Sequence, residues 1–286
     1  MVHEALAFKA YEIEELADVY FFRPLGAVAA VAARSLGLTP NQLTFAGGAV
    51  GMAAGALLYD ERLGLMAFAL LIVHGIVDSS DGQLARMTGQ TSEVGRILDG
   101  IGGYATHVAV YVAILAGYVS RGGSLSMVAW AALAGAANTA QAQLYEYHRT
   151  SYSTIVLEGL APHEDAARVD VAWVRRLFRG YMRLQRRLIG LHGRVEAAIA
   201  ARSRGGIVSD HDRSRYRAMF YGPVRGWNLL GDNTRFYAIG VLAWLHHLEW
   251  FFAFILLPMN VALGVLWCWQ RRADRRFLAL CQQPVA

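Results

Sequence analysis

The segment VDSSDGQLARMTGQTSEVGRILDGIGGYATH, residues 77–107, carries three aspartates among glycines and other small residues. Asp78 and Asp81 are three positions apart, so on a helix they share one face, and the spacing predicts a second helix that carries Asp99. A fourth carboxylate is expected one helical turn after Asp99, but that position holds Gly103. The segment therefore predicts a metal site on two helices that lacks one carboxylate.

Long apolar runs flank this segment and indicate the fold class. The chain has 286 residues, of which 55% are hydrophobic, and several runs approach the ~20 residues that a helix needs to cross a bilayer. The runs show no sustained two-residue alternation of the kind found in membrane barrels. We predict an all-α, polytopic membrane protein with a six-helix transmembrane bundle. The predicted spans are residues 43–59, 63–77, 108–119, 125–144, 236–248 and 250–269.

The predicted organisation has four parts. Residues 1–38 form an N-terminal amphipathic and juxtamembrane segment, and residues 39–146 hold the first four transmembrane helices. Residues 147–230 form a basic insert, and residues 231–286 hold the last two transmembrane helices and a basic tail. The acidic start of the chain does not resemble a cleavable signal peptide. Two cysteines, Cys268 and Cys281, make no disulfide framework.

The charge distribution predicts the orientation in the membrane. Residues 147–230 hold 15 arginines and 7 acidic residues, a net charge of +8. By the positive-inside rule this side faces the cytoplasm, and counting six spans from residue 43 places the aspartates and the C-terminus there too. We expect an integral, multi-pass protein of the inner or cell membrane. The arginines flank spans and favour contact with membrane lipids, not nucleic acid.

The insert predicts one further helix. Residues 171–204 place apolar side chains at three- and four-residue steps among arginines, a pattern typical of a helix that lies on a membrane or packs on the domain. Gly205 and Gly206 are expected to end this helix.

The three aspartates predict a hard divalent cation. Carboxylates at the mouth of an apolar bundle repel one another unless a cation holds them, and acidic residues at membrane depth are functional by default. Oxygen ligands suit Mg²⁺, Mn²⁺ or Ca²⁺ better than zinc. The alternative is that the aspartates only cap helices at the interface.

Neighbouring residues favour a phosphorylated ligand. Gly82 and Ala85 remove side-chain bulk beside Asp81, so that a ligand can approach the backbone. Arg86 can pair with phosphate oxygens. Thr88 and Ser92 add hydroxyl groups, and Gly95 allows close passage at the start of the next helix. Metal ions that bridge a pyrophosphate, together with an arginine, are the usual apparatus of phosphoryl transfer.

The pattern Asp78-x2-Asp81-Gly82-x2-Ala85-Arg86-x8-Gly95-x3-Asp99 resembles the signature of the CDP-alcohol phosphotransferase family, also called CDP-alcohol phosphatidyltransferases. The segment Thr39–Thr44 resembles the family's entry to its first span. The resemblance covers residues 39–145 well and the last two spans loosely, and it does not extend to the insert.

The resemblance implies a six-helix membrane enzyme of phospholipid biosynthesis. Such enzymes cleave the pyrophosphate of a CDP-alcohol, release CMP, and join the remaining phosphoalcohol to an acceptor alcohol. By resemblance, Asp78, Asp81 and Asp99 would hold Mg²⁺ (or Mn²⁺). Many members are dimers, so the resemblance also implies a homodimer as a candidate assembly. The residues along the CDP moiety would be Asn41, Gln42, Leu43, Thr44, Gly82, Ala85, Arg86, Ser92 and Gly95.

Gly103 stands where the family has its proposed general base, a group that typically raises the reaction rate 10²–10⁴-fold. His107, two turns after Asp99, has a suitable side chain for a substitute base, whereas Glu93 and Asp232 are weaker candidates. Two alternatives remain: an acceptor acidic or anionic enough to need no strong base, and a relative that binds CDP-alcohol or lipid without turnover. A divalent-cation channel is disfavoured by the matched glycines and Arg86.

The segment Gly231–Arg235 opens the fifth predicted span on the same side as the aspartates. Arg235, like Arg149 at the end of the fourth span, is a candidate for an acceptor phosphate or a lipid headgroup. Asn233 and Thr234 are candidates for a helix cap.

Overall fold

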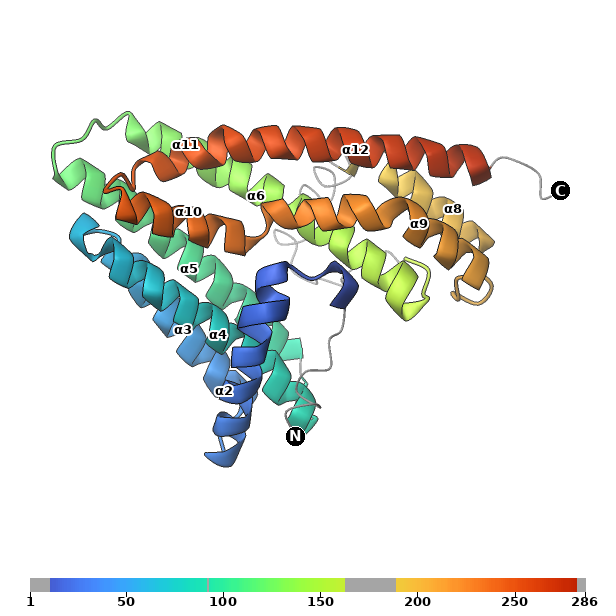
Figure 1. Cartoon of the computed structure of the whole chain (residues 1–286), viewed down its shortest axis with the longest axis horizontal. Coiled ribbons are helices and arrows are strands. Elements are labelled where there is room, and N and C mark those ends of the chain that lie inside the picture. The colour runs from blue at the N-terminus through green and yellow to red at the C-terminus, as the bar shows by residue number, and fades with distance from the viewer. Residues whose placement is uncertain (1–10, 92, 163–188, 282–286) are drawn as a thin grey trace, which may run out of the picture. The chain divides into compact units, whose positions relative to one another are not determined.

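The computed structural model describes residues 11–91, 93–162 and 189–281, which form helices, turns and two isolated β-bridges, without a strand (Figure 1). The helices are α2 (Arg23–Ser35), α3 (Pro40–Leu57), α4 (Gly64–Thr88), α5 (Glu93–Ser120), α6 (Met127–Tyr152), α8 (His192–Arg202), α9 (Asp210–Trp227), α10 (Asp232–Trp244), α11 (Trp250–Leu256) and α12 (Pro258–Cys281).

The chain divides into two compact units. The first unit comprises residues 1–137 and 232–258, and the second comprises residues 138–231 and 259–286. The boundary falls inside α6, so the C-terminal half of this helix belongs with the insert and the last helix, α12.

Within the described residues, three helical segments are long and apolar enough to cross a membrane: Glu61–Thr88, Ile97–Ser120 and Trp250–Cys281. They indicate a membrane protein. Helices also lie at the other predicted spans, but α10 has 13 residues and so extends for about 20 Å, less than the ~30 Å of a bilayer core. Six crossings therefore stay a prediction.

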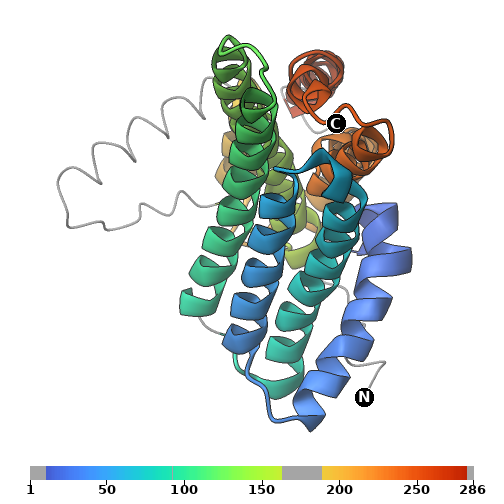
Figure 2. The same ribbon diagram turned by 90° about the vertical axis from the view of Figure 1, so that its left-hand side faces the viewer.

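Helices α2, α3, α4 and α5 of the first unit run side by side (Figure 2). Glycines allow α3 to approach α5 closely. A Cβ atom at Gly51 would lie 2.2 Å from Thr106 Oγ1, and one at Gly55 would lie 2.7 Å from the Cβ of Ala109. A larger side chain at either position would force the two helices apart.

The N-terminal segment continues directly into α2. A π-helical turn, Asp18–Phe22, leads into Arg23 without a break, and α2 buries the small residues Ala27, Ala30 and Ala33. The first part of the predicted amphipathic segment, residues 1–10, lies outside the described residues.

Residues 171–188 of the predicted helix over residues 171–204 also lie outside the described residues. Its described end, α8, follows Gly190, which has a φ of +64°. Helix α8 ends at Arg202, and Gly205 and Gly206 both follow with positive φ.

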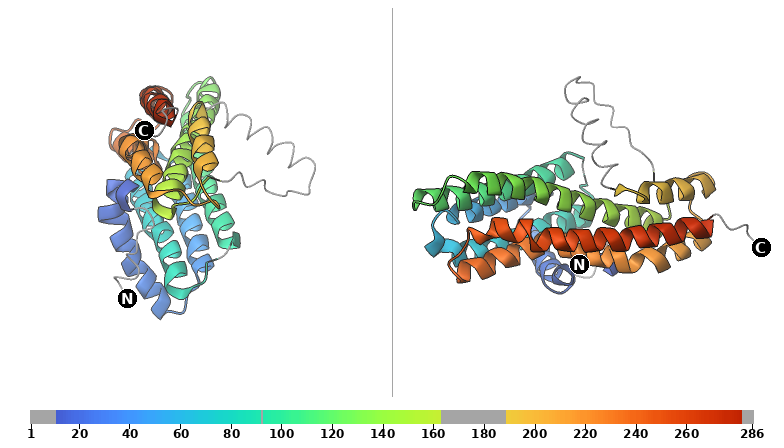
Figure 3. Two further views of the ribbon diagram at one scale, coloured as in Figure 1. Left: turned by 90° about the vertical axis from the view of Figure 1, so that its right-hand side faces the viewer. Right: turned by 90° about the horizontal axis from the view of Figure 1, so that it is seen from above.

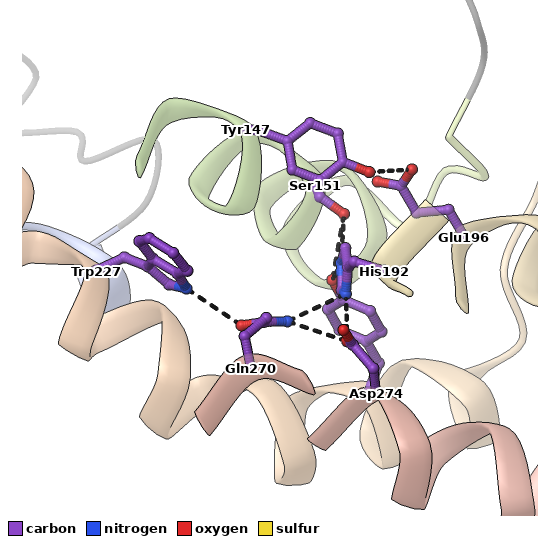
Figure 4. Close-up of polar contacts among 8 residues, drawn as sticks. Tyr147, Ser151, His192, Glu196, Trp227, Gln270 and Asp274 are labelled. Carbon is purple, nitrogen blue, oxygen red and sulfur yellow. Dashed lines mark hydrogen bonds and ion pairs between the residues drawn. The ribbon is translucent and has the colours of Figure 1, made fainter. Parts of the chain in front are cut away.

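The second unit is held together by a buried polar network centred on His192 (Figure 4). Nδ1 of His192 donates to Asp274 Oδ1 over 2.8 Å, and Nε2 lies 2.9 Å from the Tyr216 hydroxyl. Gln270 connects Asp274 to Trp227, because its side-chain amide nitrogen donates to Asp274 and its amide oxygen accepts from Trp227 Nε1. One histidine thus joins α8 to α9 and α12, and Figure 3 shows the last two alongside each other.

The order Ser151–His192–Asp274 is that of a hydrolytic triad, but its surroundings favour a structural role. Ser151 is only 5% exposed and lies 3.3 Å from Nε2, farther than the Tyr216 hydroxyl that already occupies this nitrogen. A second, partly buried contact, from the Tyr147 hydroxyl to Glu196 over 2.5 Å, links α6 to α8. The cluster therefore ties α6, α8, α9 and α12 together.

The burial of His148 predicts how the stability of the second unit depends on pH. It is 1% exposed and stacks on Trp227, and its Nδ1 has no hydrogen-bond partner. Burial, and then the charge of His192, hold the pKa of His148 well below its usual 6.5. Below pH 6.5 the unfolded chain therefore binds a proton at His148 that the folded protein excludes. As the pH decreases, the free energy of unfolding decreases with it, by up to about 1.4 kcal/mol for each pH unit.

The measurement is thermal unfolding between pH 7.5 and 5. The variant His148→Phe keeps an aromatic ring on Trp227 without the titration, and it should lose less stability than wild type as the pH falls. Equal pH slopes for the two proteins would contradict the assignment.

Candidate active site

The three predicted metal ligands all lie in the first unit. Asp78 and Asp81 come from α4 and Asp99 from α5. Asp78 and Asp99 are accessible to solvent, and their side chains come within hydrogen-bonding reach of each other. Asp81 is 8% exposed and accepts a hydrogen bond of 2.6 Å from the Thr44 hydroxyl. The sequence pattern thus brings carboxylates from two helices together beside the start of α3.

The donor set fits a hard divalent cation, although the side chains are not arranged as a finished metal site. Among the described residues, no group of three or more His, Cys, Asp or Glu side chains is placed to hold a metal ion. However, the Asp78 and Asp99 side chains lie close enough to interact, and a shared proton or a cation relieves the repulsion between two neighbouring carboxylates. All the donors are oxygens, as Mg²⁺ and Mn²⁺ prefer.

The residues predicted along the CDP moiety have different surroundings in the structure. Thr44 and Arg86 lie with the aspartates, since Thr44 binds Asp81 and the charge of Asp81 acts on Arg86. Gly82 leaves room for Arg86, whose Nη1 lies 3.5 Å from the place of a Cβ on that glycine. Asn41, at the start of α3, and Ala85 and Gly95, on α4 and α5, stay predictions.

Two other predicted contacts have structural roles, and one is not described. The side chain of Gln42 accepts from the Thr39 amide over 2.8 Å, so it completes a capping box at the start of α3. Leu43 packs against the apolar cluster of Ala30, Ala33 and Leu84. Ser92 lies outside the described residues, as does the side chain of Glu93.

Position 103 is open. No neighbouring atom lies within 4 Å of the place that a Cβ on Gly103 would take, so an aspartate would fit there. The carbonyl oxygen of Gly103 accepts from His107 Nδ1 over 2.9 Å. This contact fixes a proton on Nδ1 and leaves Nε2 as the only nitrogen of His107 that can accept one.

Nε2 of His107 faces Asp232, which from sequence alone is only a weaker candidate for the substitute base. Nε2 of His107 and Nη1 of Arg235 each lie 3.3 Å from Asp232 Oδ1. Desolvation by the surrounding protein alone would raise the pKa of the Asp232 carboxyl group. The neighbouring charges of His107, Arg235 and His74 outweigh this desolvation and lower the pKa to about 2. The carboxylate is therefore ionised, and its side chain is 59% exposed.

Arg235 and Arg149 have different surroundings. Arg235 is 1% exposed and is bound to Asp232, so its guanidinium is part of the interior of the first unit. Arg149, in the second unit, donates to the Tyr145 hydroxyl over 3.1 Å. Asn233 donates to Glu15 and Asp18 of the N-terminal segment, a contact that sequence spacing could not reveal.

Comparison with known proteins identifies a similar family. Residues 37–161 match the model of the CDP-alcohol phosphatidyltransferases. Over 65 residues, 23% of this chain, the sequence is 42% identical to the archaetidylinositol phosphate synthase of Pyrococcus horikoshii. The match spans about a third of that relative, 34% of its length. No solved structure matches the chain. The matched range holds Thr44, the three aspartates and His107, and it ends before Asp232, so the CDP-alcohol phosphatidyltransferases are the family that this part of the chain resembles.

Proposed function

We propose that the protein is a CDP-alcohol phosphotransferase of phospholipid biosynthesis. It would move a substituted phosphate group from a CDP-alcohol, such as CDP-diacylglycerol, to an acceptor alcohol and release CMP. The observation that carries the proposal is the arrangement of Thr44, Asp78, Asp81 and Asp99 on three packed helices inside the range that matches the family.

The donor would bind beside the starts of α3 and α5. Asp78, Asp81 and Asp99 are the ligands that would hold Mg²⁺ or Mn²⁺, which would neutralise charge on the diphosphate. Arg86 would pair with phosphate oxygens over the bare backbone at Gly82. Thr44 would keep the Asp81 carboxylate in one orientation through its hydroxyl. Residues 41–43 would flank the nucleotide as part of the helix start.

The acceptor's proton would go to the pair formed by Asp232 and His107. In the reaction, the acceptor oxygen bonds to the phosphorus that carries the donor alcohol, the diphosphate P–O bond breaks, and CMP leaves with that electron pair. Both nitrogens of His107 already face acceptors, Gly103 and Asp232. The exposed Asp232 carboxylate would therefore take the proton, and His107 would position it. A pKa near 2 makes Asp232 a weak base, which suits an acceptor that is itself acidic.

The test is CMP release by the purified, detergent-solubilised full chain. Donors would be CDP-diacylglycerol and CDP-choline-type alcohols with Mg²⁺ or Mn²⁺. Acceptors would include an inositol phosphate, because the similar synthase is named for archaetidylinositol phosphate. Release that depends on both donor and acceptor supports the transferase, and its absence from every pair would refute it under those conditions.

A second candidate follows from Gly103. A chain without a carboxylate at this position could bind a CDP-alcohol or lipid without turnover. In that case the protein would bind CDP in the presence of Mg²⁺ but release no CMP from any pair. The two candidates differ in turnover and share the binding site.

The proposed topology places the aspartates, residues 147–230 and the C-terminus on the cytoplasmic side of a multi-pass membrane protein. It predicts that a cysteine at the exposed position of Asp210, in a background without Cys268 and Cys281, reacts with an impermeant maleimide only from the cytoplasmic face. A cysteine in place of Ser124, between α5 and α6, should react only from the opposite face. Labelling of both positions from one face would contradict this topology.

A further inference from the structure

An ion pair joins the first residue of α2 to the segment before it, outside the range that matches the family. Glu14 is 1% exposed, and both of its carboxylate oxygens accept hydrogen bonds from the Arg23 guanidinium, one from Nε and one from Nη2. A two-point contact of this kind fixes the plane of the guanidinium. Arg23 keeps 21% of its side chain exposed.

A hydrogen bond from helix α4 fixes the backbone of Arg23 beside the candidate active site. The side-chain amide of Gln83, a fully buried residue, donates to the Arg23 carbonyl over 3.1 Å. Gln83 and Arg86 are three residues apart and therefore lie on one face of α4. Arg23 is thus anchored one helical turn from Arg86.

The charges around Arg86 agree with this geometry. The three charged groups that act on its exposed guanidinium are those of Arg23, Glu14 and Asp81. Neighbouring guanidinium groups repel each other, and an anion whose oxygens bind both relieves that repulsion. Asp81 connects the pair to the carboxylates of the candidate site.

We propose that Arg23 is a second phosphate-binding side chain beside Arg86 and that Glu14 is the residue that positions it. The inference rests on the proposed function, since the anion would be the diphosphate of a CDP-alcohol. It also assigns a role in donor binding to the segment before α2.

The test measures the affinity for CDP with Mg²⁺ by calorimetry on the full chain in detergent. Loss of a hydrogen-bonded charge contact should raise the dissociation constant of Arg23→Gln about tenfold and weaken its dependence on salt concentration. Arg34→Gln is the matched control, because Arg34 is an exposed arginine on the same helix, and it should bind CDP as wild type does. Glu14→Gln should show a smaller loss than Arg23→Gln.

The variants also separate this inference from the proposed function. If wild type does not bind CDP, the proposed function fails and this inference fails with it. If wild type binds CDP and Arg23→Gln binds equally well, only the role of Arg23 is overturned. Removing Arg23 alone leaves a buried carboxylate, which can unfold the protein. The double variant Glu14→Gln/Arg23→Gln avoids that charge, and wild-type affinity in it would also overturn the role of Arg23.

Discussion

Replacing Asp81 by asparagine is expected to slow CMP release about 10³-fold. Asp81 is the most buried of the three aspartates, and its charge acts on Arg86, beside which the diphosphate would bind. Charge neutralisation by a bound divalent cation contributes several kcal/mol to a phosphoryl transfer, and each 1.4 kcal/mol corresponds to a tenfold change in rate. An amide keeps the shape of the side chain and removes the charge that would hold the cation.

The matched control for this variant is Thr44→Val. It removes the 2.6 Å hydrogen bond to Asp81 and keeps the carboxylate, so the expected loss is about tenfold. Mn²⁺ binding, followed by electron paramagnetic resonance, supplies a readout besides turnover, and it should weaken far more in Asp81→Asn than in Thr44→Val. A rate for Asp81→Asn within tenfold of wild type would remove Asp81 from the proposed site.

Replacing Asp232 by asparagine is expected to lower kcat and kcat/KM together by about 10²-fold. This is the lower end of the range for a general base, because a carboxylate with a pKa of about 2 is a weak base. Asparagine can still accept from Arg235, which protects the fold. Asp210→Asn, at a side chain that is 98% exposed in the second unit, is the matched control and should retain the wild-type rate.

A second substitution sharpens this test. Because the space around position 103 is open, Gly103→Asp in the Asp232→Asn background should restore at least tenfold of the lost rate. Thermal unfolding of each variant confirms that it is folded. An unchanged kcat for Asp232→Asn would mean that the acceptor's proton leaves by another route.

The local part of the site could be predicted from the sequence. Asp78 and Asp81 share a face because they are three residues apart on α4, and the left-handed Gly89 ends this helix, with a φ of +67°. Apolar runs predicted where helices lie because burial in a membrane leaves a strong compositional signal. The interpretation of Gly103 as the place of a missing fourth carboxylate stays a prediction.

The long-range part of the site could not be predicted. The contact of Asp232 with His107 depends on how α10 packs against α5, and no periodicity within either helix encodes that choice. The same holds for Arg23, whose role depends on a carbonyl contact with Gln83 on another helix. The division of α6 between two units could not be predicted either, because the helix continues unbroken past Gly135 and Ala137 to Tyr152.

The glycine contacts between α3 and α5 have a mechanical consequence. Backbones that approach this closely at Gly51 and Gly55 cannot slide past each other without steric overlap. Thr44 on α3 and Asp99 on α5 therefore lie on two closely packed helices, and we expect the distance between them to change little when a ligand binds. Helix α10 contributes to the site through the polar link between Asp232 and His107. Any adjustment to acceptors of different size would thus fall on α10, while the donor side keeps its shape.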